Sequence, residues 1–185
     1  MRIAVSGTHG SGKSTLIADY LTLHPTMDHY DDPYTYLDDA ADPPGVIEYV
    51  EQLRISVNIL QELPADTPCI IERTPLDFLA YLKALHELGR TSDHRFSSHL
   101  EETIDQALSR LDLLVVLPLE HHDPIALPGG EDLDLRVAMN EALLELVDTC
   151  VLATTNRVTE IFGSRDVRLV KLLQATGTRI DTHNS

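Results

Sequence analysis

The chain has 185 residues and a mass of 20.6 kDa, which suffices for one domain with a sizeable core but not for two independent domains. Hydrophobic residues make up 43% and charged residues 24%, so the composition excludes a wholly disordered or fibrous protein. Asp and Glu number 30 against 14 Lys and Arg, and the net charge of −16 argues against nucleic acid or an anionic membrane surface as a partner.

Short apolar runs alternate with longer amphipathic segments, a pattern typical of β-α units around a parallel sheet. In chain order we expect a strand at 3–5, a helix at 13–23, a strand at 28–30, a helix at 44–63, a strand at 68–72, helices at 76–88 and 98–108, a strand at 111–117, a helix at 133–151, a strand at 158–162 and a helix at 165–175. Prolines and glycines predict a loop over 119–132, and residues 176–185 are expected to form a loose tail.

The first strand runs directly into a phosphate-binding motif. Residues 7–14 read Gly-Thr-His-Gly-Ser-Gly-Lys-Ser and match G-x-x-x-x-G-K-[ST], the P-loop or Walker A pattern, between an apolar strand and a helix. Glycines let the backbone curl so that successive N–H groups point at a phosphate, and the following helix adds its positive N-terminal end. A glycine-rich turn without a ligand is the alternative, and the strand–loop–helix context argues against it.

Each residue type in this motif predicts a contact with ATP or its metal. Lys13 would bring a full charge to the β- and γ-phosphates, the Ser14 hydroxyl would bind Mg²⁺, and Thr15 would assist at the α-phosphate. The remaining candidate nucleotide-binding residues of the loop are Gly7, His9, Gly10, Ser11 and Gly12. His9 either contacts phosphate or occupies a variable position of the pattern. We therefore predict an α/β, three-layer P-loop NTPase fold with a mostly parallel sheet of about five strands, formed by one domain over 1–175.

Two further segments follow predicted strands, where ligands bind in an open parallel sheet. Glu72 and Arg73 end the strand at 68–72, where an acid and an arginine can reach the Mg²⁺ shell and an acceptor or phosphate oxygen. Thr74 and Pro75 also suit the start of a helix, and capping is compatible with a functional role. Asp32, ahead of Asp31, is the candidate base that takes a proton from an acceptor hydroxyl; the alternative is a solvated acidic loop.

Together these motifs resemble the small P-loop kinases of the deoxyribonucleoside kinase type and a related family that includes the bacterial ribosylnicotinamide kinases. In those families an acid-Pro step follows the second strand and a D/E-R-S/T step follows the third; here they stand as Asp32-Pro33 and Glu72-Arg73-Thr74. Residues 163–168 resemble the loop that wraps the adenine edge, so Arg165 and Arg168 are candidate nucleotide-binding residues. The resemblance implies that Asp32 is the base, that Glu72 helps to hold Mg²⁺ and that Arg73 orients the acceptor.

One departure from these kinases concerns the lid, which normally carries arginines over the transferring phosphate. Residues 111–135 contain no Lys or Arg, so Arg136 is the first candidate to stabilise the transferred charge, in a lid over 119–136. The aspartate at position 32 is also shorter than the glutamate common in the deoxyribonucleoside kinases. If Arg136 does not reach the site, the protein would be a slow kinase or no kinase.

The acceptor is predicted from an uneven distribution of charge. Residues 28–51 hold eight carboxylates, no Lys or Arg, and four of the six tyrosines. Acidic and aromatic groups suit a neutral or cationic acceptor that stacks on rings, and they disfavour one that is already phosphorylated. A solvated acidic face with structural tyrosines is the alternative.

The leading hypothesis is an ATP- and Mg²⁺-dependent kinase of a small, nucleoside-like, non-anionic acceptor. It is expected to be cytoplasmic, because Met1 leads straight into the glycine-rich segment without a secretory signal and Cys69 and Cys150 lack CxxC spacing. Two alternatives stay open: a regulatory nucleotide-binding ATPase or switch that acts through a protein partner, and a pseudo-enzyme without turnover. The sequence predicts neither the acceptor's identity nor the oligomeric state.

Overall fold

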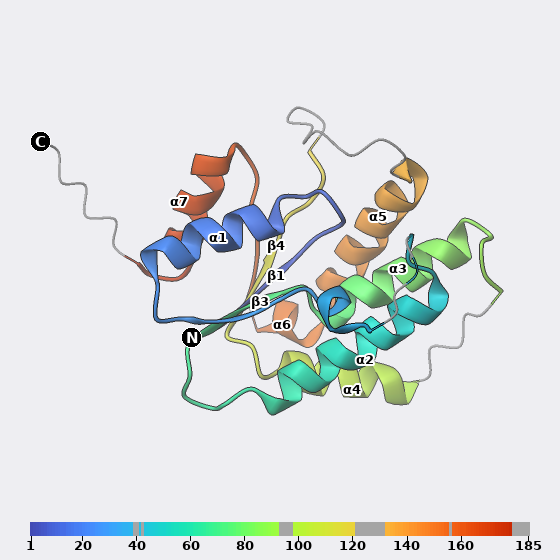
Figure 1. Cartoon of the computed structure of the whole chain (residues 1–185), viewed down its shortest axis with the longest axis horizontal. Helices are drawn as coiled ribbons and strands as arrows, with labels where there is room; N and C mark the ends of the chain where they lie inside the picture. The colour runs from blue at the N-terminus through green and yellow to red at the C-terminus, as the bar shows by residue number, and fades with distance from the viewer. Residues whose placement is uncertain (39–40, 42, 93–97, 121–131, 156, 179–185) are drawn as a thin grey trace, which may run out of the picture.

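Figure 1 shows the computed structural model of the protein, in which helices cover both faces of a central sheet. The structure describes residues 1–38, 41, 43–92, 98–120, 132–155 and 157–178. Its strands are β1 (Arg2–Ser6), β2 (Asp28–Tyr30), β3 (Cys69–Glu72), β4 (Leu113–Val116) and β5 (Val158–Glu160). The helices of the described part are α1 (Lys13–Leu23), the 3₁₀ turn η1 (Pro33–Tyr36), α2 (Val46–Glu62), α3 (Pro75–Glu87), α4 (Ser98–Leu108), α5 (Leu133–Thr149), α6 (Val151–Thr154) and α7 (Arg165–Ala175).

The five strands lie in the order β2-β3-β1-β4-β5, and every neighbouring pair is parallel. Side-chain alternation divides the core between the two faces of this sheet. Ile3 and Val5 of β1 pack with α1 and α7, whereas Ala4 packs with the helices of the opposite face. Figure 1 shows α1 and α7 together on one side of the sheet, with α2, α3, α4 and α5 on the other. The central strands β1, β3 and β4 are covered on both faces and are buried, whereas the edge strands β2 and β5 are partly exposed; the predicted fold class is confirmed.

Most predicted elements form close to their expected bounds, and α1, β2, α4 and α7 begin and end at the predicted residues. The helix expected over 133–151 is wrong at its end, because Cys150 has an extended backbone (φ −70°, ψ 161°) that separates α5 from α6. The turn η1 was not predicted; it begins at Pro33, and the Asp32 side chain caps it by accepting a hydrogen bond from the Tyr34 N–H. Most of the loop expected over 119–132 and of the tail at 176–185 lies outside the described residues.

The sheet topology decides which loops meet. β1 lies between β3 and β4, with Val5 beside Glu72 and Ser6 beside Val116. Since all strands are parallel, the segments that follow β1, β2 and β3 leave the sheet at the same edge. In open α/β sheets this edge is where ligands bind, on either side of the strand at which the connections reverse direction.

Candidate active site

The phosphate loop between β1 and α1 depends on glycines at fixed points. Gly7 has φ +154°, and a β-carbon there would lie 2.6 Å from Ser11 Oγ and 2.8 Å from the Leu117 carbonyl oxygen, closer than side chains tolerate. Gly12 precedes α1 with φ +89°, in the left-handed region that glycine adopts without steric cost. Any larger residue at Gly7 would therefore push the loop away from the end of β4.

A buried carboxylate fixes the start of this loop. Asp77, in the first turn of α3, is fully buried and accepts hydrogen bonds from Ser6 Oγ (2.5 Å), the Gly7 N–H (2.9 Å) and the Thr74 N–H (2.8 Å). The same side chain thus caps α3 and holds the phosphate loop. The capping was predicted from Thr74 and Pro75; the contact with Gly7 was missed, because a pairing across 70 residues leaves no local pattern.

Lys13 extends back along the loop and is only 4% exposed. Its Nζ donates a hydrogen bond to the Thr8 carbonyl oxygen at 3.0 Å. Burial lowers the pKa of Lys13 to about 8, and the charge of Arg73 acts in the same direction. The hydroxyls of Thr8 and Ser11 are also buried and have no hydrogen-bond partner among the described residues. Buried donors without partners are costly, so this loop is suited to an anion that would accept from them.

Ser14 and Glu72 are brought together as the sequence predicts. The Ser14 hydroxyl donates to Glu72 Oε1 at 2.8 Å, which joins the first turn of α1 to the end of β3. A hydroxyl and a carboxylate are oxygen donors of the kind that Mg²⁺ prefers, so this pair fits that ion. In the described ranges, no group of three or more His, Cys, Asp or Glu side chains is arranged for a metal.

Arg73 lies at the centre of the site and is 6% exposed. Its φ is +68°, an unusual value for a residue with a β-carbon, which costs about 1–2 kcal/mol and is typical of functional positions. Its Nε donates to Asp32 Oδ2 at 2.5 Å, and its Nη1 donates to the Gly7 carbonyl oxygen at 3.2 Å. Burial acts to raise the pKa of Asp32, but the Arg73 guanidinium and the Tyr34 N–H outweigh it and hold that pKa below its usual range. Asp32 is therefore an ionised carboxylate beside the phosphate loop.

Two aromatic rings lie next to this pair. Tyr49 of α2 and Tyr81 of α3 are both buried and stack with centroids 4.4 Å apart. The Tyr81 hydroxyl accepts a hydrogen bond from the His9 N–H at 3.0 Å, and the Arg73 guanidinium lies 5.6 Å from the Tyr81 ring. Of the tyrosines in the acidic stretch, Tyr49 is thus connected to the loop through Tyr81, whereas Tyr34 and Tyr36 are exposed. The contact of Tyr81 with the loop was missed, because it joins residues that lie 72 positions apart in the sequence.

Arg136 reaches the phosphate loop from α5. Its Nε donates to the His9 carbonyl oxygen at 2.9 Å, and its Nη2 donates to that of Gly10 at 3.2 Å. At the start of the same helix, Asp132 pairs with Arg90. Arg136 thus contacts the main chain of the phosphate loop, and its role toward a transferred phosphoryl group stays a prediction. Most of the lid predicted over 119–136 lies outside the described residues.

The two arginines of α7 lie in different surroundings. Arg165 is exposed and pairs with Asp19 of α1, with Nε–Oδ2 and Nη2–Oδ1 distances of 2.7 and 2.6 Å. Arg168 is 7% exposed, and its Nη1 donates to the Ser11 carbonyl oxygen of the phosphate loop at 2.6 Å. Of the two, Arg168 is the one that contacts the loop directly. Thr15, the last predicted nucleotide-binding residue, is exposed in the first turn of α1.

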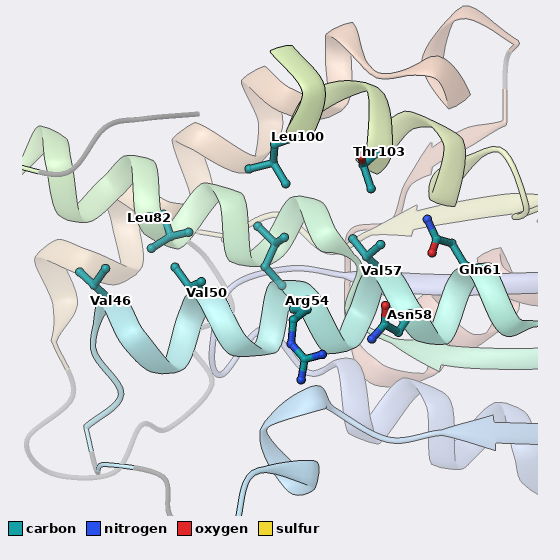
Figure 2. Close-up of a pocket in the computed structure, with 10 residues that line it drawn as sticks. Val46, Val50, Arg54, Val57, Asn58, Gln61, Leu82, Leu100 and Thr103 are labelled. Carbon is teal, nitrogen blue, oxygen red and sulfur yellow. The ribbon is translucent and has the colours of Figure 1, made fainter. Parts of the chain in front are cut away.

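A separate hollow of about 520 Å³ lies among α2, α3 and α4 (Figure 2). Its wall is mainly apolar, with Val46, Val50 and Val57 along α2 and Leu100 on α4, and Arg54, which also lines it, is paired with Glu51. Among the described residues that line it, none is a predicted site residue. Separately, none of the helices in the described part of the chain combines the length and the apolar character needed to cross a membrane.

Comparison with solved structures identifies the fold. Deoxyadenosine kinase from M. mycoides with bound dATP is 15% identical, with a TM-score of 0.66 over 96% of this chain and 99% of that one. Thymidylate kinase from Candida albicans is 17% identical, with a TM-score of 0.63 over 96% and 91%. The fold is that of the P-loop kinases. No family model and no curated protein matches the sequence.

A third similar structure is the NadR protein in complex with NR, at 15% identity and a TM-score of 0.64. All of this chain is covered, but only 54% of the NadR chain, so the protein spans about half of that neighbour. The resemblance to P-loop kinases expected from the sequence is thus confirmed at the level of fold. Sequence identities of 15–17% support a shared fold but not a shared activity, so the activity has to be argued from the site.

Proposed function

We propose that the protein is a Mg²⁺-dependent kinase that transfers the γ-phosphoryl group of ATP to a hydroxyl of a small, nucleoside-like acceptor without a phosphate of its own. The observation that carries this proposal is the meeting of two groups at one sheet edge. Lys13 suits an anion, as do the hydroxyls of Thr8 and Ser11, which have no partner in the part of the chain that the structure describes, while the Asp32–Arg73 pair lies beside the same loop. A nucleotide-binding loop with an adjacent carboxylate is what phosphoryl transfer to a hydroxyl requires.

Each residue has a role in the proposed reaction. Lys13 and the loop N–H groups hold the phosphates. The oxygen of the acceptor hydroxyl forms a bond to the γ-phosphorus as the bond to ADP breaks, and Asp32 accepts the proton of that hydroxyl. The lowered pKa makes Asp32 a weak base. A weak base suffices for a loose transition state, because the acceptor hydroxyl then needs to lose little of its proton before the phosphoryl group is transferred. Arg73 and Arg136 stabilise the transferred charge. Mg²⁺, when bound through Ser14 and Glu72, would neutralise charge on the phosphate oxygens.

The acceptor class is inferred from charge and from the neighbours. Asp32 of the acidic stretch is bonded to Arg73, whose guanidinium lies 5.6 Å from the Tyr81 ring of the stacked tyrosine pair. In the proposed reaction Arg73 is committed to Asp32 and to the transferred charge. A phosphorylated acceptor would need a cation of its own. Among the structural neighbours are a deoxyadenosine kinase and a protein solved with NR, which supports a nucleoside-like acceptor over other hydroxyl compounds.

The proposal is tested by measuring ADP formation from ATP and Mg²⁺ alone, with a panel of nucleosides, and with the matching nucleoside monophosphates. We expect ADP formation to depend on a nucleoside and to be slower with each monophosphate. Hydrolysis that responds only to a protein partner would support the alternative, a regulatory ATPase, and binding without turnover would support a pseudo-enzyme.

Nucleotide binding should weaken at alkaline pH. The pKa of Lys13 is lowered from 10.5 to about 8, so the empty loop loses this positive charge as the pH rises through 8. ATP affinity should then fall by up to roughly tenfold per pH unit above 8, with proton uptake on binding. Calorimetry at pH 7 to 9.5 in buffers of different ionisation enthalpy measures both effects. An affinity that stays constant over this range would contradict the role of Lys13.

A further inference from the structure

Arg168 is a buried charge with three separate partners. Its Nη1 donates to the Ser11 carbonyl oxygen at 2.6 Å, its Nε to the Gly163 carbonyl oxygen at 2.6 Å, and its Nη2 to Glu120 Oε1 at 2.8 Å. Ser11 belongs to the phosphate loop, Gly163 to the loop between β5 and α7, and Glu120 to the segment after β4. One guanidinium therefore joins three loops at the sheet edge that carries the candidate site.

The loop at Gly163 is fixed from two sides. Its N–H donates to the same Glu120 Oε1, at 2.8 Å, while its carbonyl oxygen accepts from Arg168. Gly163 has φ +114°, and a β-carbon there would lie 2.8 Å from Val167 Cγ1, so a larger residue would displace this loop. The geometry leaves the loop little freedom relative to Arg168.

The hydrogen bond from Arg168 to Ser11 is not needed to satisfy the buried charge of Arg168. Glu120 and Gly163 already pair the guanidinium, as a buried charge requires. The third bond crosses 157 residues of sequence to the main chain of the phosphate loop at Ser11, whose hydroxyl has no partner within the described ranges. Because Arg168 donates to main-chain oxygens and to Glu120, it sets the position of the loop rather than presenting its charge to the front of it.

We propose that Arg168 is a positioning residue that fixes the spacing between the phosphate loop and the β5–α7 loop. This inference rests on the proposed function, in which a nucleotide occupies the phosphate loop. A nucleotide whose base lies against the β5–α7 loop would contact that loop with its base and the phosphate loop with its phosphates. It gains affinity from both contacts only if the distance between the two loops is fixed before it binds. A ligand that consists of phosphates alone does not use this spacing.

The test compares ATP with inorganic tripolyphosphate as ligands, by calorimetry, for the wild type and Arg168→Met. We expect the variant to weaken ATP binding by about tenfold and tripolyphosphate binding by less than about threefold. Lys83→Met is the control, since Lys83 lies on α3 and donates to Glu145 of α5 at 2.9 Å, outside both loops. Its ratio of ATP to tripolyphosphate affinity should equal that of the wild type.

Glu120→Gln provides a second variant that keeps the side-chain shape, in case Arg168→Met does not fold; it should lower the same ratio by a smaller factor. Equal losses for ATP and tripolyphosphate in both variants, or no loss in either, would overturn the positioning role. If the wild type bound neither ligand, the proposed function itself would fail, so the two failures are distinguishable.

Discussion

Replacing Lys13 with methionine should lower ATP turnover by at least about 10²-fold and leave the protein folded. The ammonium group is the buried cation of the phosphate loop, and a methionine side chain has similar length but no charge. Loss of one such electrostatic contact to a transferring phosphoryl group costs about 10²–10³-fold in turnover, and weaker ATP binding adds to this. The measurement is ADP formation at saturating acceptor.

The stability of the Lys13→Met variant separates a catalytic effect from a folding effect. In the fold, burial lowers the pKa of Lys13 from 10.5 to about 8, so the unfolded chain binds more protons between these values and stability rises with pH through that window. Below pH 8 the buried ammonium is a cost that methionine lacks, and the variant should melt no lower than the wild type. Lys83→Met, at a surface pair with Glu145, is the control that should keep wild-type turnover. Full activity of Lys13→Met would refute the phosphate-loop role.

Asp32→Asn should produce the second large loss. The substitution removes the proton acceptor and neutralises the carboxylate that pairs with buried Arg73. General-base catalysis is worth about 10²–10⁴-fold, so turnover at saturating substrates should fall within that range while ATP binding changes little. The Tyr34 N–H and Arg73 Nε donate to different oxygens of Asp32, and asparagine keeps only one acceptor oxygen, so the melting temperature of the variant is measured beside its turnover.

Asp31→Asn tests whether the loss comes from one carboxylate or from the general negative charge of this stretch. Asp31 is the adjacent residue; its side chain is 63% exposed and lies 3.5 Å from His29. This variant removes the same charge, yet we expect less than about a threefold change in turnover, because an exposed charge is largely screened. Equal losses from the two variants would remove the base assignment to Asp32.

The parts of the site that could be predicted from the sequence are those that follow from local pattern. The phosphate loop needs its residue types within eight consecutive positions, and Glu72 and Arg73 follow directly from a strand that reads as buried. Because parallel strands share their carboxyl edge, the meeting of Asp32 with Arg73 could also be expected.

The parts that could not be predicted depend on packing between distant elements. Asp77 holds Gly7, Tyr81 accepts from His9, and Arg168 contacts Ser11, each across 70 or more residues. No periodicity or spacing encodes such contacts, because they depend on how helices pack against the sheet. For the same reason the acidic stretch did not reveal which of its tyrosines is buried; Tyr49 is, since α2 turns it toward α3.

The most direct test of the proposed activity follows the γ-phosphoryl group itself. ATP labelled at the γ-phosphate is incubated with the protein, Mg²⁺ and each nucleoside, and the products are separated and identified by mass. We predict that the label appears on the hydroxyl of a nucleoside, forming its monophosphate, and that Asp32→Asn slows this transfer. Label recovered only as inorganic phosphate, at a rate independent of any nucleoside, would contradict the assignment of this protein as a small-molecule kinase.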